Sequence, residues 1–411
     1  MRTGLYSIAL LLFIAHITIA QKFPNLARTP PMGWNTWNKF ACNVDETLIR
    51  ASADAMVSSG LRDAGYVYVV IDDCWHGQRD SLGFIQPDPV KFPSGMKVLA
   101  DYIHLKGLKI GIYSDAGNKT CGGRPGSRGH EYQDALTYAS WGIDFLKYDW
   151  CDTEGLKAEG AYATMRDALY VAGHPIVLSL CEWGNNKPWT WAENVGQLWR
   201  TTGDIYHCFD CEDKHKDWSS WGVLQILDMQ DGLRKYAGPD HWNDPDMMEV
   251  GNGMTVLEDR AHFSMWCMLA APLMAGNDIA KMTKETHAIL TNKEAIAIDQ
   301  DELGVQGFRH HVKDSVETWF KPLQNGDWAV CFLNRKNVGQ KVEMNWMNEI
   351  VSDLEVSKQD ASFGKITYTI RNVWTKKDID TTAKSFKSEL GPHDVILLRL
   401  SPQKTTSKKR T

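Results

Sequence analysis

The chain has 411 residues, of which 43% are apolar and 10% aromatic, so it can bury a large core in one big domain and a smaller one. Its 45 basic and 51 acidic residues are spread along the sequence and give a formal charge of -6, which excludes a basic face for nucleic acid or an anionic membrane. A neutral partner fits this charge balance better.

The first twenty residues have the pattern of a secretory signal. Arg2 precedes an apolar run, and Thr18, Ile19 and Ala20 provide a small-residue cleavage pattern. The apolar run is short for a membrane span, although an uncleaved anchor is the alternative. We expect a signal peptide over residues 1–20, a secreted or periplasmic mature protein, and no membrane attachment after cleavage.

Eight short β-rich runs alternate with helical patterns between about residues 31 and 300. In chain order they are MGWNTW, YVYVVIDDCW, KIGIYSDAG, IDFLKYDWC, PIVLSLCEWG, QLWRTTGD, HWNDPDM and PLMAGND. Such alternation predicts an α/β fold with a parallel sheet, and eight units in roughly 270 residues match a (β/α)₈ TIM barrel.

The connections between the runs predict helices on the outside of the barrel. In residues 45–65, apolar side chains recur near helical spacing, and we expect these to face the core: Leu48, Ala51, Ala55, Met56 and Leu61. Only about twenty residues separate the ends of the fifth and sixth runs, so the helix there must be short or replaced by a loop.

The sequence texture changes after about residue 305. Short alternating segments, VETWFKPL, WAVCFLNR, KVEMNW, ITYTIRNVW and DVILLRL, are separated by turn signals and predict an antiparallel β-sandwich. We therefore expect a catalytic barrel over 21–303, a C-terminal sandwich over 304–400 that gives packing support, and a disordered basic tail over 401–411.

Nine cysteines occur, at positions 42, 74, 121, 151, 181, 208, 211, 267 and 331. Export makes disulfides possible, and spacing alone does not determine which cysteines pair. Cys208 and Cys211 form a CxxC without a second CxxC or a matched histidine pair, so a local disulfide or free thiols are favoured over a metal site.

Carboxylates stand at the ends of seven of the eight runs, where a TIM barrel carries its active site. They are Asp72 and Asp73, Asp115, Asp149, Glu182, Asp204, Asp246 and Asp278, while Trp34 and Trp37 close the first run. A single carboxylate at a strand end commonly caps the following helix, but carboxylates in a circle at one end of the barrel repel one another and therefore indicate a functional site. Binding of a neutral sugar is such a function, because carboxylates accept hydrogen bonds from hydroxyls and tryptophan faces cover the C–H patches of the sugar ring.

Glycosidic cleavage needs two carboxyl groups at the anomeric carbon, and we assign Asp149 as nucleophile and Asp204 as general acid/base. Lys147 shares a strand face with Asp149 and can keep it ionised, and Arg200 shares a face with Asp204. Because Asp204 must be protonated in the first step, burial or other carboxylates have to outweigh Arg200. This chemistry requires no cofactor and no metal.

The motifs PPMGWNTW, IDDCW, GIYSDAGNKTCGGRPGS, LKYDWC, CEWG, WRTTGDI and WNDPDMM resemble, in this order, those of glycoside hydrolase family 27, which contains α-galactosidases and α-N-acetylgalactosaminidases. The resemblance implies a retaining exo-glycosidase that removes terminal α-D-galactose by double displacement, with Asp149 as nucleophile and Asp204 as acid/base. It also implies galactose contacts from Trp34, Asp72, Asp73, Tyr113, Lys147, Glu182, Trp183, Arg200, Asp246 and Met247.

The resemblance further implies disulfides joining Cys42 to Cys74 and Cys121 to Cys151, the second beside the nucleophile. In CEWG, Glu182 and Trp183 would meet the substituent at C2 and clash with an N-acetyl group. The Asp72-Asp73 pair favours an axial O4 and a hydroxymethyl O6.

Three alternatives remain open at this point. Two are enzymes on the same scaffold, a β-L-arabinopyranosidase and an α-N-acetylgalactosaminidase. The third is a non-catalytic galactose-binding protein, whose mark would be loss of Asp149 or Asp204, and both are present. The expected partners are α-galactosides and no nucleic acid, and the expected assembly is a monomer or homodimer.

Overall fold

A computed structural model describes residues 22–403 of the protein. The expected signal peptide, residues 1–20, and residues 404–411 of the expected tail lie outside this range. Within it, none of the helices combines the length and the apolar character needed to cross a membrane.

Eight parallel strands form the central sheet of the N-terminal domain. They are hydrogen-bonded in the order β11-β8-β7-β6-β5-β2-β1-β12. Their bounds are β1 (Met32–Asn35), β2 (Tyr68–Ile71), β5 (Lys109–Asp115), β6 (Phe145–Asp149), β7 (Val177–Cys181), β8 (Leu198–Arg200), β11 (Trp242–Asp244) and β12 (Leu273–Ala275). A bridge between Met248 and Ala275 joins the segment after β11 to β12. Each strand lies in one of the eight predicted runs, and this confirms the (β/α)₈ barrel.

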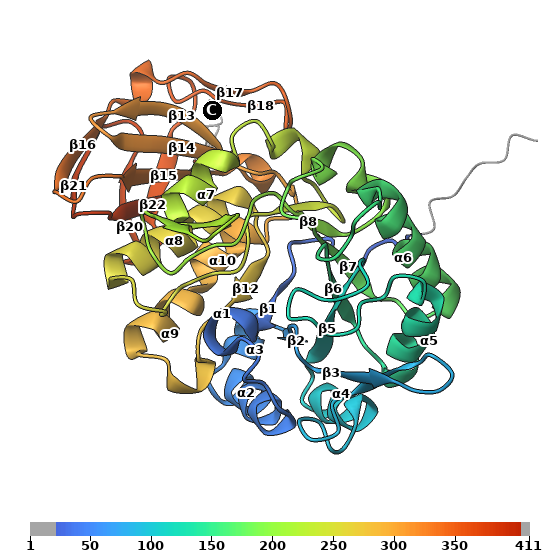
Figure 1. Ribbon diagram of the computed structural model, residues 1–411. Coiled ribbons are helices and arrows are strands. Elements are labelled where there is room, and N and C mark those ends of the chain that lie inside the picture. The colour runs from blue at the N-terminus through green and yellow to red at the C-terminus, as the bar shows by residue number, and fades with distance from the viewer. Residues whose placement is uncertain (1–21, 404–411) are drawn as a thin grey trace, which may run out of the picture.

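Helices surround the barrel (Figure 1). They are α1 (Trp37–Phe40), α2 (Glu46–Ser58), α3 (Leu61–Ala64), α4 (Met96–Leu105), α5 (Glu131–Trp141), α6 (Ala158–Ala172), α7 (Val223–Met229), α8 (Val256–Leu269), α9 (Lys284–Leu290) and α10 (Lys293–Asp299). Short 3₁₀ turns are η1 (Pro188–Thr190), η2 (Ala192–Asn194), η3 (Arg234–Tyr236), η4 (Ile279–Lys281), η5 (Gln324–Gly326) and η6 (Trp346–Asn348). Only η1 and η2 lie between β7 and β8, as the short connection predicted.

The buried face of α2 agrees with the predicted one except at Ala51, and Leu48 and Ala55 pack partly buried against the core. Met56 is buried as expected, and so is Leu61 in α3, but Ala51 is exposed and Ile49 and Ala53 face the core in its place. Alanine is small enough to stand on either face of a helix, so an alanine-rich segment indicates the helical period more securely than the direction of its buried stripe.

The C-terminal domain is an antiparallel sandwich, which confirms the prediction from its alternating segments. One sheet has the order β13-β14-β15-β22-β19-β20, and its partners are the pairs β16-β21 and β17-β18. The bounds are β13 (Phe308–Lys313), β14 (Val316–Pro322), β15 (Trp328–Asn334), β16 (Gln340–Met344), β17 (Val351–Asp353), β18 (Gln359–Ala361), β19 (Tyr368–Asn372), β20 (Lys377–Thr381), β21 (Phe386–Leu390) and β22 (Val395–Pro402). Strand β22 therefore continues past the expected boundary at residue 400.

Two hairpins extend from the barrel. One pairs β3 (His76–Arg79) with β4 (Ile85–Pro87), and the other pairs β9 (Glu212–Lys214) with β10 (Ser219–Trp221). The second hairpin follows β8 in the chain, on the side of the barrel where the strands end.

An ion network joins the barrel to the sandwich. Glu317 on β14 has a side chain only 1% exposed, and it accepts bonds from Arg309 at 2.8 Å and Arg335 at 2.7 Å. Both arginines also contact Asp228 on α7, at 3.0 and 2.7 Å. The two domains thus share a network whose central carboxylate is buried.

We expect Glu317→Gln to lower the free energy of unfolding by about 3 kcal/mol, because it removes the charge that compensates two partly buried guanidinium groups. Denaturant unfolding followed by circular dichroism measures this change. Glu343→Gln, which breaks an exposed pair with Lys387, is the matched control and should leave stability unchanged. Equal stability of both variants would contradict a structural role for the network.

Candidate active site

A pocket of about 360 Å³ opens where the barrel strands end. Ten of the twelve residues expected to catalyse or to contact a sugar line it: Asp72, Asp73, Tyr113, Lys147, Asp149, Trp183, Arg200, Asp204, Asp246 and Met247. They come from six different strands or the turns that follow them. Parallel pairing brings these ends together, since it places Tyr113 opposite Lys147 and Asp115 opposite Asp149.

Asp149 ends β6 and is almost completely buried, with 6% of the residue exposed. The Tyr113 hydroxyl donates to its Oδ2 at 2.8 Å, and the Trp150 backbone N–H donates to its Oδ1 at 2.9 Å. Burial raises the pKa of Asp149 to about 6, Lys147 opposes this rise, and the nearby charge of Asp204 adds to it. The group is a carboxylate at neutral pH that titrates within the mildly acidic range.

Lys147 favours the ionised form of Asp149, as strand parity predicts, although its direct partner is another carboxylate. Its Nζ lies 2.8 Å from Asp72 Oδ2, and that oxygen also accepts from the Asn35 amide at 2.8 Å. Burial lowers the pKa of Lys147, but the surrounding carboxylates, with Asp72 first, hold it well above its usual value. The lysine therefore remains charged between two acidic groups and acts on Asp149 through space.

Arg200 bridges two carboxylates across the pocket. One terminal nitrogen lies 3.1 Å from Asp204 Oδ1 and 2.9 Å from Asp246 Oδ2. Asp246 is buried, and its carboxylate also accepts the backbone N–H groups of Ile205 and Met247. The Asp204 side chain is 43% exposed, so this carboxyl meets solvent while Asp149 does not.

Asp73 is anchored to the neighbouring loop. Its two oxygens accept the backbone N–H groups of Cys74 and Gly122, both at 2.6 Å. A Cβ at Gly122 would stand 2.8 Å from the carboxylate, so only glycine allows this approach. Cys74 is disulfide-bonded to Cys42, as the family resemblance implies.

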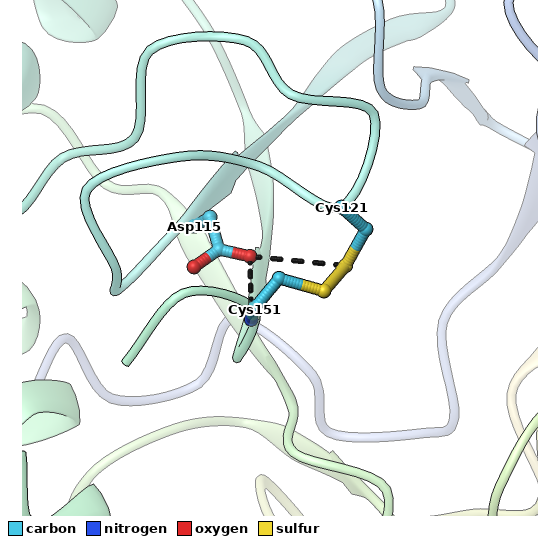
Figure 2. Close-up of side chains that lie close together, drawn as sticks. All are labelled: Asp115, Cys121 and Cys151. Carbon is cyan, nitrogen blue, oxygen red and sulfur yellow. Dashed lines mark hydrogen bonds between the residues drawn. A yellow bond between two sulfur atoms is a disulfide. The ribbon is translucent and has the colours of Figure 1, made fainter. Parts of the chain in front are cut away.

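A disulfide between Cys121 and Cys151 lies beside Asp115, which ends β5 (Figure 2). Asp115 Oδ2 accepts the Cys151 backbone N–H at 2.9 Å, and Oδ1 accepts that of Gly117 at 2.7 Å. Burial and the charge of Asp149 raise the pKa of Asp115 to about 8. Because the two sulfurs are bonded to each other, this group of residues offers no thiolate for a metal.

Two expected sugar contacts are fully buried and are not among the residues that line the pocket. Trp34 packs in the core and donates its indole N–H to the Asn277 carbonyl at 2.8 Å. Glu182 turns back into its own loop, where Asn186 donates to it from the backbone at 2.6 Å and from the side chain at 2.7 Å. Burial raises the pKa of Glu182 to about 7.

The hairpin after β8 supplies pocket residues that strand-end reasoning missed. Tyr206, His207, His215, Trp218 and Ser220 all line the pocket. A disulfide between Cys208 and Cys211 closes the base of this segment. The CxxC was the available signal, because a local disulfide indicates an ordered loop directly after β8.

Comparison with known proteins agrees with this geometry. Residues 29–301 match the family described as Alpha galactosidase A, and residues 313–400 match the alpha galactosidase C-terminal beta sandwich domain. Alpha-galactosidase A of Cellvibrio japonicus is 59% identical over 384 residues, which cover 93% of this chain and 95% of that protein. Alpha-galactosidase 3 of Arabidopsis thaliana is 47% identical over 92% of this chain and 83% of its own.

A solved structure shows the same architecture. Alpha-galactosidase I from Mortierella vinacea superposes with a TM-score of 0.85 and 38% identity, over 91% of this chain and 97% of that one. Together with the matches to both domains, this similarity shows that the chain belongs to the alpha-galactosidase family, glycoside hydrolase family 27.

Proposed function

We propose that this protein is a retaining α-galactosidase that hydrolyses terminal, non-reducing α-D-galactose from oligosaccharides, polysaccharides or glycoconjugates. The observation that carries the proposal is the pair of carboxyl groups in one pocket, Asp149 buried and hydrogen-bonded and Asp204 open to solvent. Retaining hydrolysis needs one carboxylate as nucleophile and a second carboxyl that exchanges a proton twice in each cycle.

In the first step, an Asp149 oxygen bonds to the anomeric carbon while the bond from that carbon to the leaving oxygen breaks. The proton of Asp204 goes to the leaving oxygen, so the alcohol departs neutral. Tyr113 and the Trp150 N–H hold the Asp149 carboxylate and prevent its rotation. Burial of Asp149 removes water that would otherwise solvate the nucleophile.

In the second step, Asp204 accepts a proton from water, which attacks the anomeric carbon and displaces Asp149. Two inversions restore the α configuration of the released galactose. The 43% exposure of the Asp204 side chain suits this exchange of substrate alcohol for water on its side of the pocket.

Galactose hydroxyls have partners on the opposite wall. Lys147 has three donors and uses one on Asp72, so two remain for sugar oxygens. The carboxylates of Asp72 and Asp73 are acceptors suited to the axial O4 and the hydroxymethyl O6. Exclusion of an N-acetyl group at C2 rests on Trp183, since Glu182 turns away from the pocket.

The partners and the location of the protein belong to the same proposal. α-Galactosides are the substrate class, with no nucleic acid. Three disulfides in the described residues support export to an oxidising compartment, secreted or periplasmic. The assignment of residues 21–303 to catalysis and 304–400 to support, and the monomer or homodimer, stay predictions.

Hydrolysis of p-nitrophenyl α-D-galactopyranoside, with the product anomer followed by NMR, tests the substrate and the mechanism together. We expect the wild type to release α-galactose first and Asp149→Asn to lose roughly 10⁴-fold or more in kcat, because the amide is not a nucleophile. The β-L-arabinopyranoside and α-N-acetylgalactosaminide analogues should react more slowly. A faster reaction of either analogue would move the assignment to that enzyme class.

Azide separates the roles of the two carboxyl groups. With Asp149→Gly, azide attacks the intact substrate directly, and one inversion should give β-galactosyl azide. With Asp204→Gly, azide attacks the galactosyl ester of Asp149 on a substrate with a good leaving group, and the product should be the α-azide. The opposite pairing of variant and product would exchange the two assignments.

The pH profile follows from the ionisation of Asp149. Because its raised pKa is about 6 and only the carboxylate attacks, kcat/KM should fall about tenfold per unit as pH drops below 6. Tyr113→Phe removes a donor to the charged form and should move this midpoint upward by about one unit. Tyr132→Phe, on an exposed face of α5, is the control, and an unmoved midpoint in Tyr113→Phe would refute the coupling.

A further inference from the structure

Two consecutive histidines and a glutamate meet at one edge of the C-terminal sandwich. His310 and His311 lie on β13, and Glu349 directly follows η6. One ring nitrogen from each histidine and one carboxylate oxygen of the glutamate lie within 4.8 Å of one another. None of the three residues lines the active-site pocket, so this cluster is separate from the chemistry proposed above.

A β-bulge in β13 brings the two imidazoles to the same face of the sheet. The register partners on β14 are Trp319 for Arg309 and Thr318 for His311. His310 is therefore an extra residue between them, without an opposite partner. Consecutive side chains of a regular strand point to opposite faces, which would leave the sheet between the two histidines. The bulge removes this alternation at the one place where two ligands follow each other.

Contacts with β14 show which face the histidines share. The His310 ring meets the ring of Phe320 edge-on, with centroids 5.3 Å apart, and Phe320 belongs to the sandwich core. His311 Nε2 lies 3.2 Å from the hydroxyl of Thr318, and this contact orients its ring. Thr318 and Phe320 stand two residues apart on one strand, so they project to the same face. Both imidazoles therefore point into the space between the two layers of the sandwich.

Glu349 reaches this space from the second layer. It follows Trp346 in η6, between β16 and β17, and Trp346 is fully buried in the same core. Glu349 Oε2 lies 3.3 Å from His310 Nε2, and both side chains are 23% exposed. Groups at this depth are positioned by the fold and are still open to ions in solution.

The separations suit a small transition-metal ion. Zn²⁺ binds imidazole nitrogen and carboxylate oxygen at about 2.0 to 2.2 Å, so that tetrahedral ligand atoms stand roughly 3.3 Å apart. The contact between His310 and Glu349 already has this length, and closing the widest gap of 4.8 Å takes a shift of about 1.5 Å. Two imidazoles favour Zn²⁺ over Ca²⁺ and Mg²⁺, which prefer oxygen ligands.

We propose that His310, His311 and Glu349 form a Zn²⁺ site, completed by water, that ties β13 to the η6 segment of the second layer. The inference does not depend on the proposed function. β13 is an edge strand of its sheet, so a bound ion holds a strand that is paired on one side only. Arg309 precedes the bulge and joins the barrel at Asp228, so zinc should also stabilise the docking of the two domains.

Calorimetric titration with ZnCl₂ tests the site in the whole protein, produced without a histidine tag and freed of metal by a chelator. We expect one Zn²⁺ per chain with a Kd on the order of 1 µM, weaker than at closed four-ligand sites because water supplies the fourth ligand. His310→Gln, His311→Gln and Glu349→Gln should each weaken binding tenfold or more, since each removes a ligand.

His393→Gln is the matched control. His393 Nδ1 lies 2.7 Å from Glu258 Oε1, with side chains 20% and 16% exposed, in a pair that joins no three-ligand cluster among residues 22–403. This variant should bind Zn²⁺ with unchanged affinity. X-ray absorption at the zinc edge of the wild type requires no substitution, and it should show two imidazole rings and oxygen in the coordination sphere.

Thermal unfolding measures what the ion contributes to stability. Zinc at roughly 100 times its Kd should raise the Tm of the wild type by about 3 °C, because the ion binds the folded chain. The rise should be absent in Glu349→Gln and retained in His393→Gln. Ca²⁺ at the same concentration should leave the Tm of the wild type unchanged.

Absence of saturable Zn²⁺ binding by the wild type would overturn the proposal. Equal affinity in the wild type and all three ligand variants would place the ion elsewhere and equally overturn it. Sulfur in the zinc coordination sphere would do the same, because it would assign the ion to cysteines and not to the sandwich cluster.

Discussion

Several carboxyl groups meet at one end of this barrel, and Lys147 and Arg200 are the cations that make the arrangement tolerable. Each lies among more than one acidic group: Lys147 bonds Asp72 and acts on Asp149, and Arg200 joins Asp204 to Asp246. A buried charge without a partner costs several kcal/mol, roughly 3 to 5 when one member of a buried pair is removed. The close approach of the carboxyl groups in the pocket therefore depends on these two cations.

Burial and the nearby charge of Asp149 disfavour the ionised form of Asp115, so this carboxyl group makes the stability of the fold depend on pH. Its pKa of about 8 in the folded protein exceeds the value of an unfolded aspartate, about 3.9, so the folded state holds the proton more tightly. The stabilisation linked to this proton is full below the unfolded pKa and is lost as pH rises through 8. The Cys121–Cys151 disulfide closes a loop of 30 residues beside this group, and such a loop contributes about 3 to 4 kcal/mol.

Strand-end residues could be predicted from the sequence because their positions follow from the barrel itself. Asp149 and Tyr113 face the pocket since side chains alternate along β5 and β6. The rule does not extend one residue beyond β7, where the backbone turns at Trp183 and Glu182 accepts bonds from Asn186. It also gives no account of the β9-β10 hairpin, whose position depends on bonds to Asp204 and on the Cys208–Cys211 disulfide. On α2 the predicted stripe was wrong only at Ala51, because an alanine can occupy either face of a helix.

The two carboxyl groups proposed as nucleophile and acid/base lie in parts of the fold that differ in how firmly they are held. Asp149 belongs to a strand paired on both sides, so its position is tied to the barrel core. Asp204 lies in a loop beyond β8, and its carbonyl accepts a bond from β10 of the hairpin that also carries Trp218. A change in that hairpin therefore moves Asp204 and Trp218, which both line the pocket, together. The surroundings of Asp204 can thus vary with the hairpin, while the position of Asp149 stays tied to the paired strands of the barrel.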